Sequence, residues 1–226
     1  MNDKERVAKK AAMEVSSGMV VGLGTGSSAD CFIEALAQRH HQEGLAVQTV
    51  VSSIVSMQKA QQLGLPMMAI EHLNQLDYYV DGADEVTDDL VLSKGQGADL
   101  VREKILATAA DKFIVLIDES KRVRQIGDRF PVPVEVIPFS WQLVVKALQG
   151  VGGQAVLRPN TNNSGLAVTS YGNLLLDVDF GSLLTAEQID TTLNAMPGVI
   201  EHGIFRDLAS VVYIGADGVV EELRRL

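Results

Sequence analysis

Short apolar segments alternate with helical segments along the first half of this chain, and this alternation restricts the fold more than any other feature. Brief apolar runs predict strands, whereas apolar residues recurring every three or four positions predict helices. Strands are predicted at 19–23, 46–51, 66–70, 78–80 and 113–117, and helices at 3–16, 28–40, 57–63 and 98–110. Because strands that alternate with helices form parallel sheets, we expect a parallel sheet covered on both faces.

The pattern changes near residue 128, where prolines become frequent. Pro131, Pro133 and Pro138 punctuate a segment that otherwise alternates like a strand, and proline lacks the N–H that a central strand donates. We therefore expect that this segment is not a well-paired central strand. Helices at 139–148 and 185–195, strands at 155–157 and 174–180, and one last strand at 211–214 complete the prediction.

These elements predict an α/β protein with two domains. Residues 1–127 and 199–226 are expected to form one domain with a parallel sheet, because the C-terminal tail is too short to fold alone. Residues 128–198 are expected to form a second, smaller α+β domain.

The composition is that of an ordinary globular protein, with 226 residues and a net charge of −10. The acidic balance argues against nucleic acid as a partner, because nucleic-acid binders normally present a basic stripe. No apolar run approaches the roughly 18 residues of a membrane span, and no apolar region follows the charged amino terminus. The single Cys31 cannot form an internal disulfide. We expect a cytoplasmic protein with no membrane partner.

A glycine-rich turn follows the first predicted strand. Gly22, Gly24 and Gly26 alternate there, and Ser27 and Ser28 open the next helix. Backbone N–H groups at a helix start bind phosphate, and the serine hydroxyls add donors. The spacing matches neither the dinucleotide fingerprint nor a P-loop. The turn predicts a phosphate site, and a capped glycine turn without a ligand is the alternative.

A cluster of carboxylates follows the predicted strand 78–80. Asp81, Asp84 and Glu85 would lie at the carboxyl end of a buried strand, where open α/β sheets bind ligands. Crowded carboxylates suit proton transfer or hydroxyl binding, and they also suit a hard cation. An acidic surface turn is the alternative.

A lysine and two glycines precede the helix predicted at 98–110. Lys94 is followed by Gly95 and Gly97, which would let the backbone approach a ligand closely. Glu103 lies in the helix itself. Taken alone, Glu103 is expected to be a solvated helix residue, and only the neighbouring loops make it a candidate.

In this order and spacing, the motifs resemble ribose-5-phosphate isomerase of the A type. The resemblance is carried by segments that span nearly the whole chain, at 22–27, 79–85, 94–98, 102–105, 118–121, 133–138 and 197–199. It implies an aldose–ketose isomerase of the pentose phosphate pathway that interconverts D-ribose 5-phosphate and D-ribulose 5-phosphate. It further implies a Rossmann-like first domain, a small α+β second domain, no metal or other cofactor, a small sugar phosphate as partner, and a homodimer or homotetramer.

The resemblance also assigns roles to individual residues. Glu103 matches the general base, which would move a proton between C2 and C1 of the open-chain sugar through an enediolate. The other catalytic groups that it implies are Asp81, Asp84 and Lys94. Substrate-binding positions are expected at Thr25, Gly26, Ser27, Ser28, Gly82, Ala83, Gly95, Gln96, Gly97 and Lys121.

The chain departs from the family pattern at a few positions. Gln96 replaces a glycine, Ser28 stands where threonine is common, and segments 169–173 and 52–56 also differ. An isomerase of a different sugar phosphate is therefore one alternative, and a non-catalytic sugar-phosphate sensor is another. An enzyme like the acyl-CoA transferases would use a glutamate nucleophile and would require a larger chain or a second subunit.

Overall fold

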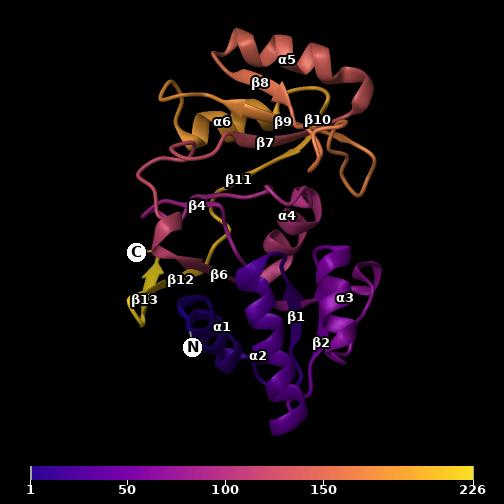
Figure 1. Ribbon diagram of the computed structural model, residues 1–226, viewed down its shortest axis with the longest axis vertical. Coiled ribbons are helices and arrows are strands. Elements are labelled where there is room, and N and C mark those ends of the chain that lie inside the picture. Colours follow the sequence, from indigo (N-terminus) through magenta and orange to yellow (C-terminus); the bar gives the residue numbers. More distant parts are fainter. Residues whose placement is uncertain (1, 226) are drawn as a thin grey trace. The chain divides into compact units, whose positions relative to one another are not determined.

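The computed structural model describes residues 2–225 (Figure 1). The chain folds into two compact units. Unit 1 comprises Met1–Ala83, Arg102–Lys121 and Leu208–Leu226, and unit 2 comprises Asp84–Val101 and Arg122–Asp207. Segments 84–101, 122–127 and 199–207, which the sequence assigned to the first domain, thus group with the second unit. The reason is strand pairing in unit 2, described below.

Unit 1 is built on a six-stranded sheet in the order β13-β12-β6-β3-β1-β2. Neighbouring strands are parallel, except that β12 and β13 form an antiparallel hairpin. The strands are β1 (Val20–Leu23), β2 (Gln48–Val51), β3 (Leu76–Asp81), β6 (Ala110–Asp118), β12 (Val211–Ala216) and β13 (Val219–Arg224). The prediction of an α/β fold with a mainly parallel sheet is confirmed.

Two predictions for the edges of this sheet are wrong. Segment 66–70 makes only an isolated bridge, between Thr49 and Met67, and then enters the 3-10 helix η1 (Ile70–His72). Met67 is exposed, so a full strand there would bury little apolar surface. At the other edge, β13 was not expected, because its charged side chains give it little apolar alternation.

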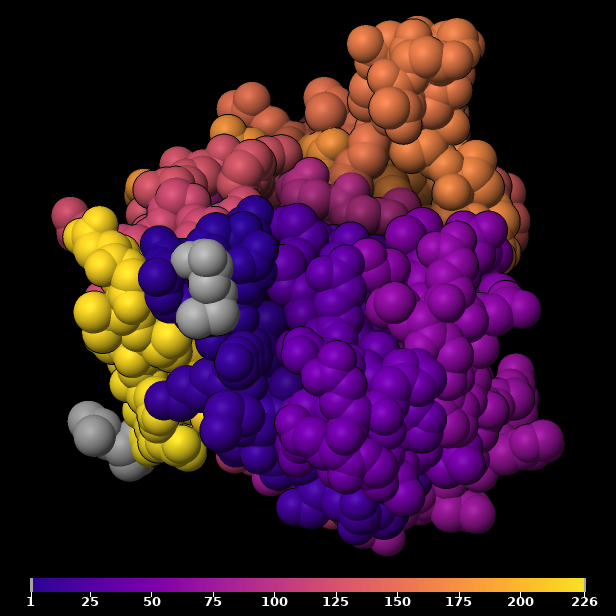
Figure 2. All heavy atoms as spheres, turned by 60° about the horizontal axis from the view of Figure 1, so that its bottom comes forward, coloured from indigo at the N-terminus to yellow at the C-terminus, as the bar shows by residue number. Residues whose placement is uncertain are grey.

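The helices of unit 1 pack against one another and against the sheet. They are α1 (Asp3–Glu14), α2 (Ser27–Glu43), α3 (Ile54–Gln62) and α4 (Leu100–Ala109), the last of which begins in unit 2. A capping box starts α1, since the Asn2 side chain accepts from Glu5 N and the Glu5 side chain accepts from Asn2 N. Helix α1 contacts α2, β12 and β13, and Figure 2 shows the indigo N-terminal residues beside the yellow C-terminal strands.

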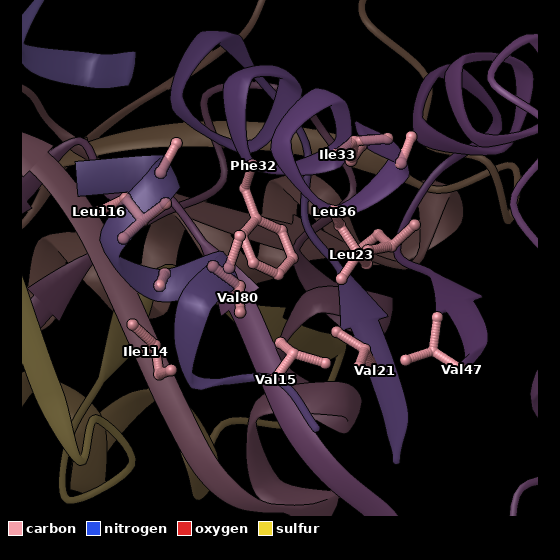
Figure 3. Packing of buried hydrophobic residues seen from close by; sticks show 14 of the residues in the cluster. Val15, Val21, Leu23, Phe32, Ile33, Leu36, Val47, Val80, Ile114 and Leu116 are labelled. Carbon is pink, nitrogen blue, oxygen red and sulfur yellow. The ribbon is translucent and has the colours of Figure 1, made fainter. Parts of the chain in front are cut away.

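The main core of unit 1 lies between the α1–α2 pair and the sheet. Phe32 points from α2 toward the strands, with Val80 and Leu116 nearby, and Leu36 faces Leu23 (Figure 3). All these side chains are fully buried. Because this packing fixes β1 and β3 against α2, it also fixes the loops in which these strands end.

Unit 2 is built on a four-stranded antiparallel sheet in the order β10-β7-β9-β8. Helices α5 (Trp141–Gly150) and α6 (Ala186–Asn194) share an apolar core with it. The four strands are β7 (Val132–Val136), β8 (Gln154–Leu157), β9 (Leu174–Asp179) and β10 (Val199–His202). A second small sheet joins β4 (Glu85–Val86), β5 (Leu92–Ser93) and β11 (Ile204–Phe205).

The prediction for the proline-rich segment is wrong, because β7 is an inner strand paired with both β10 and β9. Pro133 is tolerated for a local reason. Its carbonyl accepts a hydrogen bond from Gly203 N, just beyond His202, where β10 ends. In a strand, the N and C=O of one residue point to the same side, so the missing N–H faces the end of β10 and not a continuous ladder.

Within residues 2–225, no helix has both the length and the apolar character needed to cross a membrane.

Candidate active site

The sheet order of unit 1 indicates where a ligand can bind. From β1 the chain moves outward to β2 and then returns to β3 on the other side of β1. In open parallel sheets, such a reversal leaves a crevice beyond the carboxyl ends of the two strands. The glycine-rich turn and the sequence 81–83 follow β1 and β3, so both predicted loops lie at this edge.

The turn after β1 requires glycine at two positions for different reasons. A Cβ on Gly24 would lie 2.1 Å from Asp81 Oδ1, so no side chain fits there. Gly26 has φ +103°, a conformation that disfavours side chains. The first hydrogen bond of α2 runs from Asp30 N to Gly26 O, so the amides of Ser27 and Ser28 precede it and point out of the helix start. These outward amides are the groups on which the prediction of a phosphate site rests.

The Thr25 side chain anchors this turn from inside. Its Oγ1 lies 2.9, 2.7 and 3.0 Å from the Oγ atoms of Ser52, Ser53 and Ser56, and Ser56 Oγ also donates to Gly24 O at 2.5 Å. The three serines come from the end of β2 and the start of α3. The hydroxyl of Thr25 thus holds the loop in place, whereas the sequence predicted that Thr25 binds the substrate.

A lysine that was not among the predicted site residues lies beside the start of α2. Lys4 Nζ, from α1, donates to Ser27 Oγ at 2.9 Å and lies 4.0 Å from Asp118 Oδ2. Asp118 ends β6, and Lys121 follows it at the end of η2 (Glu119–Lys121). No sequence motif marks this lysine as functional. Only the packing of α1 shows that it lies beside Ser27 and Asp118.

Asp81 is buried at the end of β3 and holds several groups at once. Its Oδ1 accepts hydrogen bonds from the backbone amides of Thr25 and Gly82, at 3.0 and 2.7 Å, and its Oδ2 accepts from the Tyr79 hydroxyl at 2.5 Å. Burial raises the pKa of Tyr79 well above its usual value, and the charges of Asp81 and Glu103 add to the shift. Tyr79 therefore stays protonated and donates to Asp81.

The rest of this loop brings the β1 turn close to the end of β3. A Cβ on Gly82 would lie 3.9 Å from Ser28 Cβ and 3.7 Å from Leu116 O. Gly82 and Ala83 are half-buried, so a ligand could approach their backbone groups. In unit 1 the structure thus brings together the predicted residues of the β1 turn and of the β3 end.

Glu103 occupies the first turn of α4 and is only 4% exposed. The alternative that applies to Glu103 taken alone, a solvated helix residue, is therefore wrong. Its charge contributes to the raised pKa of Tyr79, after burial and the charge of Asp81, so the carboxylate acts on Tyr79 within unit 1. Ile105, by contrast, is half exposed, so Glu103 and not Ile105 lies on the buried face of α4. A buried carboxylate beside polar groups is a candidate for proton transfer.

The Lys94 loop lies in unit 2 and is held by its own neighbours. Lys94 N donates to Gly203 O at 2.9 Å, and Lys94 Nζ lies 5.7 Å from the centre of the Phe205 ring. The lysine side chain is 4% exposed. Gly95 has φ +102°, and its Cβ would lie 3.0 Å from Leu100 Cδ2, so the position requires glycine. Gln96 and Gly97, in contrast, are exposed.

Asp84 and Glu85, the other two carboxylates of the predicted cluster, have different hydrogen-bond partners. Asp84 Oδ2 accepts from Gln96 N at 3.3 Å, which connects it to the Lys94 loop within unit 2. The buried Glu85 accepts hydrogen bonds from the amides of Gly127, Arg129 and Phe130, so it holds a turn and not a ligand.

The hypothesis that these carboxylates bind a hard cation is not supported by their arrangement. Among the described residues 2–225, no group of three or more His, Cys, Asp or Glu side chains could hold a metal ion.

A family model described as ribose 5-phosphate isomerase A (phosphoriboisomerase A) matches residues 48–218. The chain belongs to the ribose 5-phosphate isomerase A family. Its relatives include the ribose-5-phosphate isomerase A of Thermomicrobium roseum, 40% identical over 98% of this chain and 93% of that protein. The enzyme of the same name from Rhodopseudomonas palustris is 43% identical over 96% and 95%.

Solved structures of the family superpose closely on this fold. The ribose 5-phosphate isomerase A of Methanocaldococcus jannaschii gives a TM-score of 0.93 at 39% identity, with 98% of each chain covered. A D-ribose-5-phosphate isomerase in complex with phospho-erythronic acid gives 0.95 at 37% identity, with 100% of each chain covered. The predicted isomerase activity and family are confirmed, and the sensor alternative is not favoured.

Proposed function

We propose that Glu103 is the general base of ribose 5-phosphate isomerisation in this protein. The observation that carries the proposal is the burial of the Glu103 carboxylate, in the unit that also holds Asp81, Tyr79 and the β1 turn. Glu103 would remove the proton from C2 of the open-chain aldose and return it to C1, through an enediolate. A positioned base of this kind typically contributes about 10²–10⁴-fold in rate.

The phosphate of the substrate is proposed to bind at the start of α2. The amides and hydroxyls of Ser27 and Ser28 supply donors, and Lys4 and Lys121 supply positive charge. The relative that was solved with phospho-erythronic acid binds a phosphorylated sugar acid, which supports a sugar phosphate as substrate here. Binding the non-reacting phosphate would supply energy to orient the reacting carbons.

Lys94 is proposed to stabilise the negative oxygen of the enediolate, together with backbone amides of its loop. Asp84 would bind or deprotonate the sugar hydroxyls, including the step that opens the ring. Asp81 would share this task, and its hydrogen bonds to Thr25, Gly82 and Tyr79 also give it a positioning role. These assignments need neither a metal nor another cofactor.

Turnover of ribose 5-phosphate by the purified protein in the presence of EDTA tests the metal-free reaction. We expect ribulose 5-phosphate to form at the same rate with and without the chelator. A rate that EDTA abolishes and added divalent metal restores would contradict the proposal. Other aldose phosphates should be assayed beside it, because a kcat/KM at least tenfold higher for one of them would change the substrate assignment.

We further propose that the protein acts in the cytoplasm as a homodimer or homotetramer. The resemblance to the family supports this, as do the apolar side chains that unit 2 exposes, with Phe139 at 88% and both Leu143 and Leu183 at 72%. Sedimentation equilibrium should give two or four times the chain mass of 24.3 kDa. A mass equal to one chain at micromolar concentration would contradict this proposal.

A further inference from the structure

A nearly buried ion pair lies at the start of the connection between β8 and β9. Arg158 Nε donates to both carboxylate oxygens of Asp177, at 3.1 and 3.0 Å, and a second guanidinium nitrogen also donates to Asp177 Oδ1. The side chains of Arg158 and Asp177 are 11% and 17% exposed. A forked pair of this kind holds the guanidinium in one plane, which a lysine could not do.

The remaining guanidinium nitrogen of Arg158 reaches the Lys94 loop. It donates to Gly95 O at 2.9 Å and to Gln96 O at 3.2 Å, all within unit 2. The loop needs such support, because Ala98 has φ +68°, a conformation that residues with a side chain disfavour. Strained backbone of this kind persists only where its surroundings hold it.

A second contact from the same connection holds the end of this segment. Ser170 Oγ donates to Asp99 Oδ1 at 3.1 Å, and Asp99 directly precedes α4. The turn that carries Ser170 is fixed by the buried Glu135, whose Oε1 accepts from Thr169 Oγ1 at 2.9 Å and from Asn173 Nδ2 at 2.8 Å. Segment 158–173 thus contacts both ends of the stretch from Gly95 to Asp99.

We propose that Arg158, oriented by Asp177, is a positioning residue that fixes the Lys94 loop in its active conformation. The role of the loop in catalysis rests on the proposed function above. Donors at a reacting centre must be held within about 0.5 Å of their productive positions, and a misplacement of about 1 Å can cost 10²-fold in rate. Arg158 does not need to contact the substrate to have this effect.

The same geometry explains why Gln96 is compatible with the loop. Arg158 binds the carbonyl of residue 96, and the side chain of Gln96 is exposed. Recognition of the main chain does not depend on which side chain stands there. The replacement of a glycine at this position therefore leaves the contact with Arg158 in place.

The test combines kinetics with amide hydrogen exchange in the ligand-free enzyme. Arg158→Met and Asp177→Asn should each lower kcat/KM by about 10- to 100-fold and speed exchange at the amides of residues 96–98. Arg158→Lys should recover part of the loss, because it keeps the charge but not the fork. Arg206→Met, which removes a partly exposed arginine of unit 2 paired with Glu187, is the matched control and should change neither quantity.

The double variant Arg158→Met/Asp177→Asn guards against simple unfolding, since it leaves no unpaired charge behind. It should fold and be no less active than Arg158→Met alone, because the two residues act as one unit. Wild-type kcat/KM and unchanged exchange at residues 96–98 in a folded Arg158→Met variant would overturn the proposal. If the wild-type protein does not isomerise ribose 5-phosphate, the proposed function fails, whereas the exchange data still test the contact.

Discussion

Replacing Glu103 with glutamine is expected to lower kcat by about 10²–10⁴-fold. Glutamine has the same size and can still accept a hydrogen bond, but it cannot take up a proton at neutral pH. The loss corresponds to about 2.7–5.5 kcal/mol in activation free energy. KM should stay within a few-fold of the wild-type value, because the proposed phosphate site lies at the start of α2. Steady-state kinetics with ribose 5-phosphate measures both parameters.

A second glutamate of unit 1 provides the control for this variant. Glu34 lies in α2 and pairs with Lys59 on the surface, so Glu34→Gln removes the same charge without touching the site. It should retain wild-type turnover. Substrate deuterated at C2 gives an independent readout, since Glu103→Gln should remove the label from C2 as slowly as it forms product. If Glu103→Gln kept more than a tenth of wild-type kcat, the base would be another group, with Asp84 the next to test.

The parts of the fold that were predicted correctly from the sequence are those with a strong local pattern of apolar residues or glycines. The apolar runs at β1, β3 and β6 and the helices between them gave the parallel sheet, and the glycines at 24 and 26 marked the turn. Strands such as β4 and β5, with two residues each, have no period to detect. They exist because β4 pairs with β5 and β11 pairs with β5 from far along the chain, and this pairing moves segment 84–101 into unit 2.

The candidate site was predictable where a motif carried it and was missed where packing creates it. The residue types around Asp81 and Lys94 formed recognisable motifs, whereas Lys4 and Arg158 stand in segments without one. Burial of Glu103 was also not predictable from its helix alone, since a glutamate in a helix is by itself expected to be solvated. Tertiary contacts decide such positions, because the energy of burying a charge depends on the partners that the fold supplies.

Replacing Lys94 with methionine is expected to lower kcat by about 10²–10³-fold. Methionine keeps the length and the apolar stem but removes the ammonium that is proposed to stabilise the enediolate oxygen. Folding should survive, because Lys94 is 4% exposed and a buried charge is costly to keep. The backbone contacts of the loop, from Lys94 N to Gly203 O and from Arg158 to Gly95 O, do not involve the side chain that is removed. Circular dichroism and steady-state kinetics together separate the two effects.

Comparison with two further variants decides what the lysine contributes. Lys146→Met removes an exposed lysine from α5 in the same unit and should retain wild-type kinetics. Lys94→Arg keeps the positive charge but replaces a compact ammonium by a planar fork, so it should recover only part of kcat. A stabiliser of the enediolate acts mainly in the transition state, so its loss lowers kcat with little change in KM. If Lys94→Met raised KM at unchanged kcat, the lysine would bind the substrate in its ground state, and the enediolate would depend on the backbone amides instead.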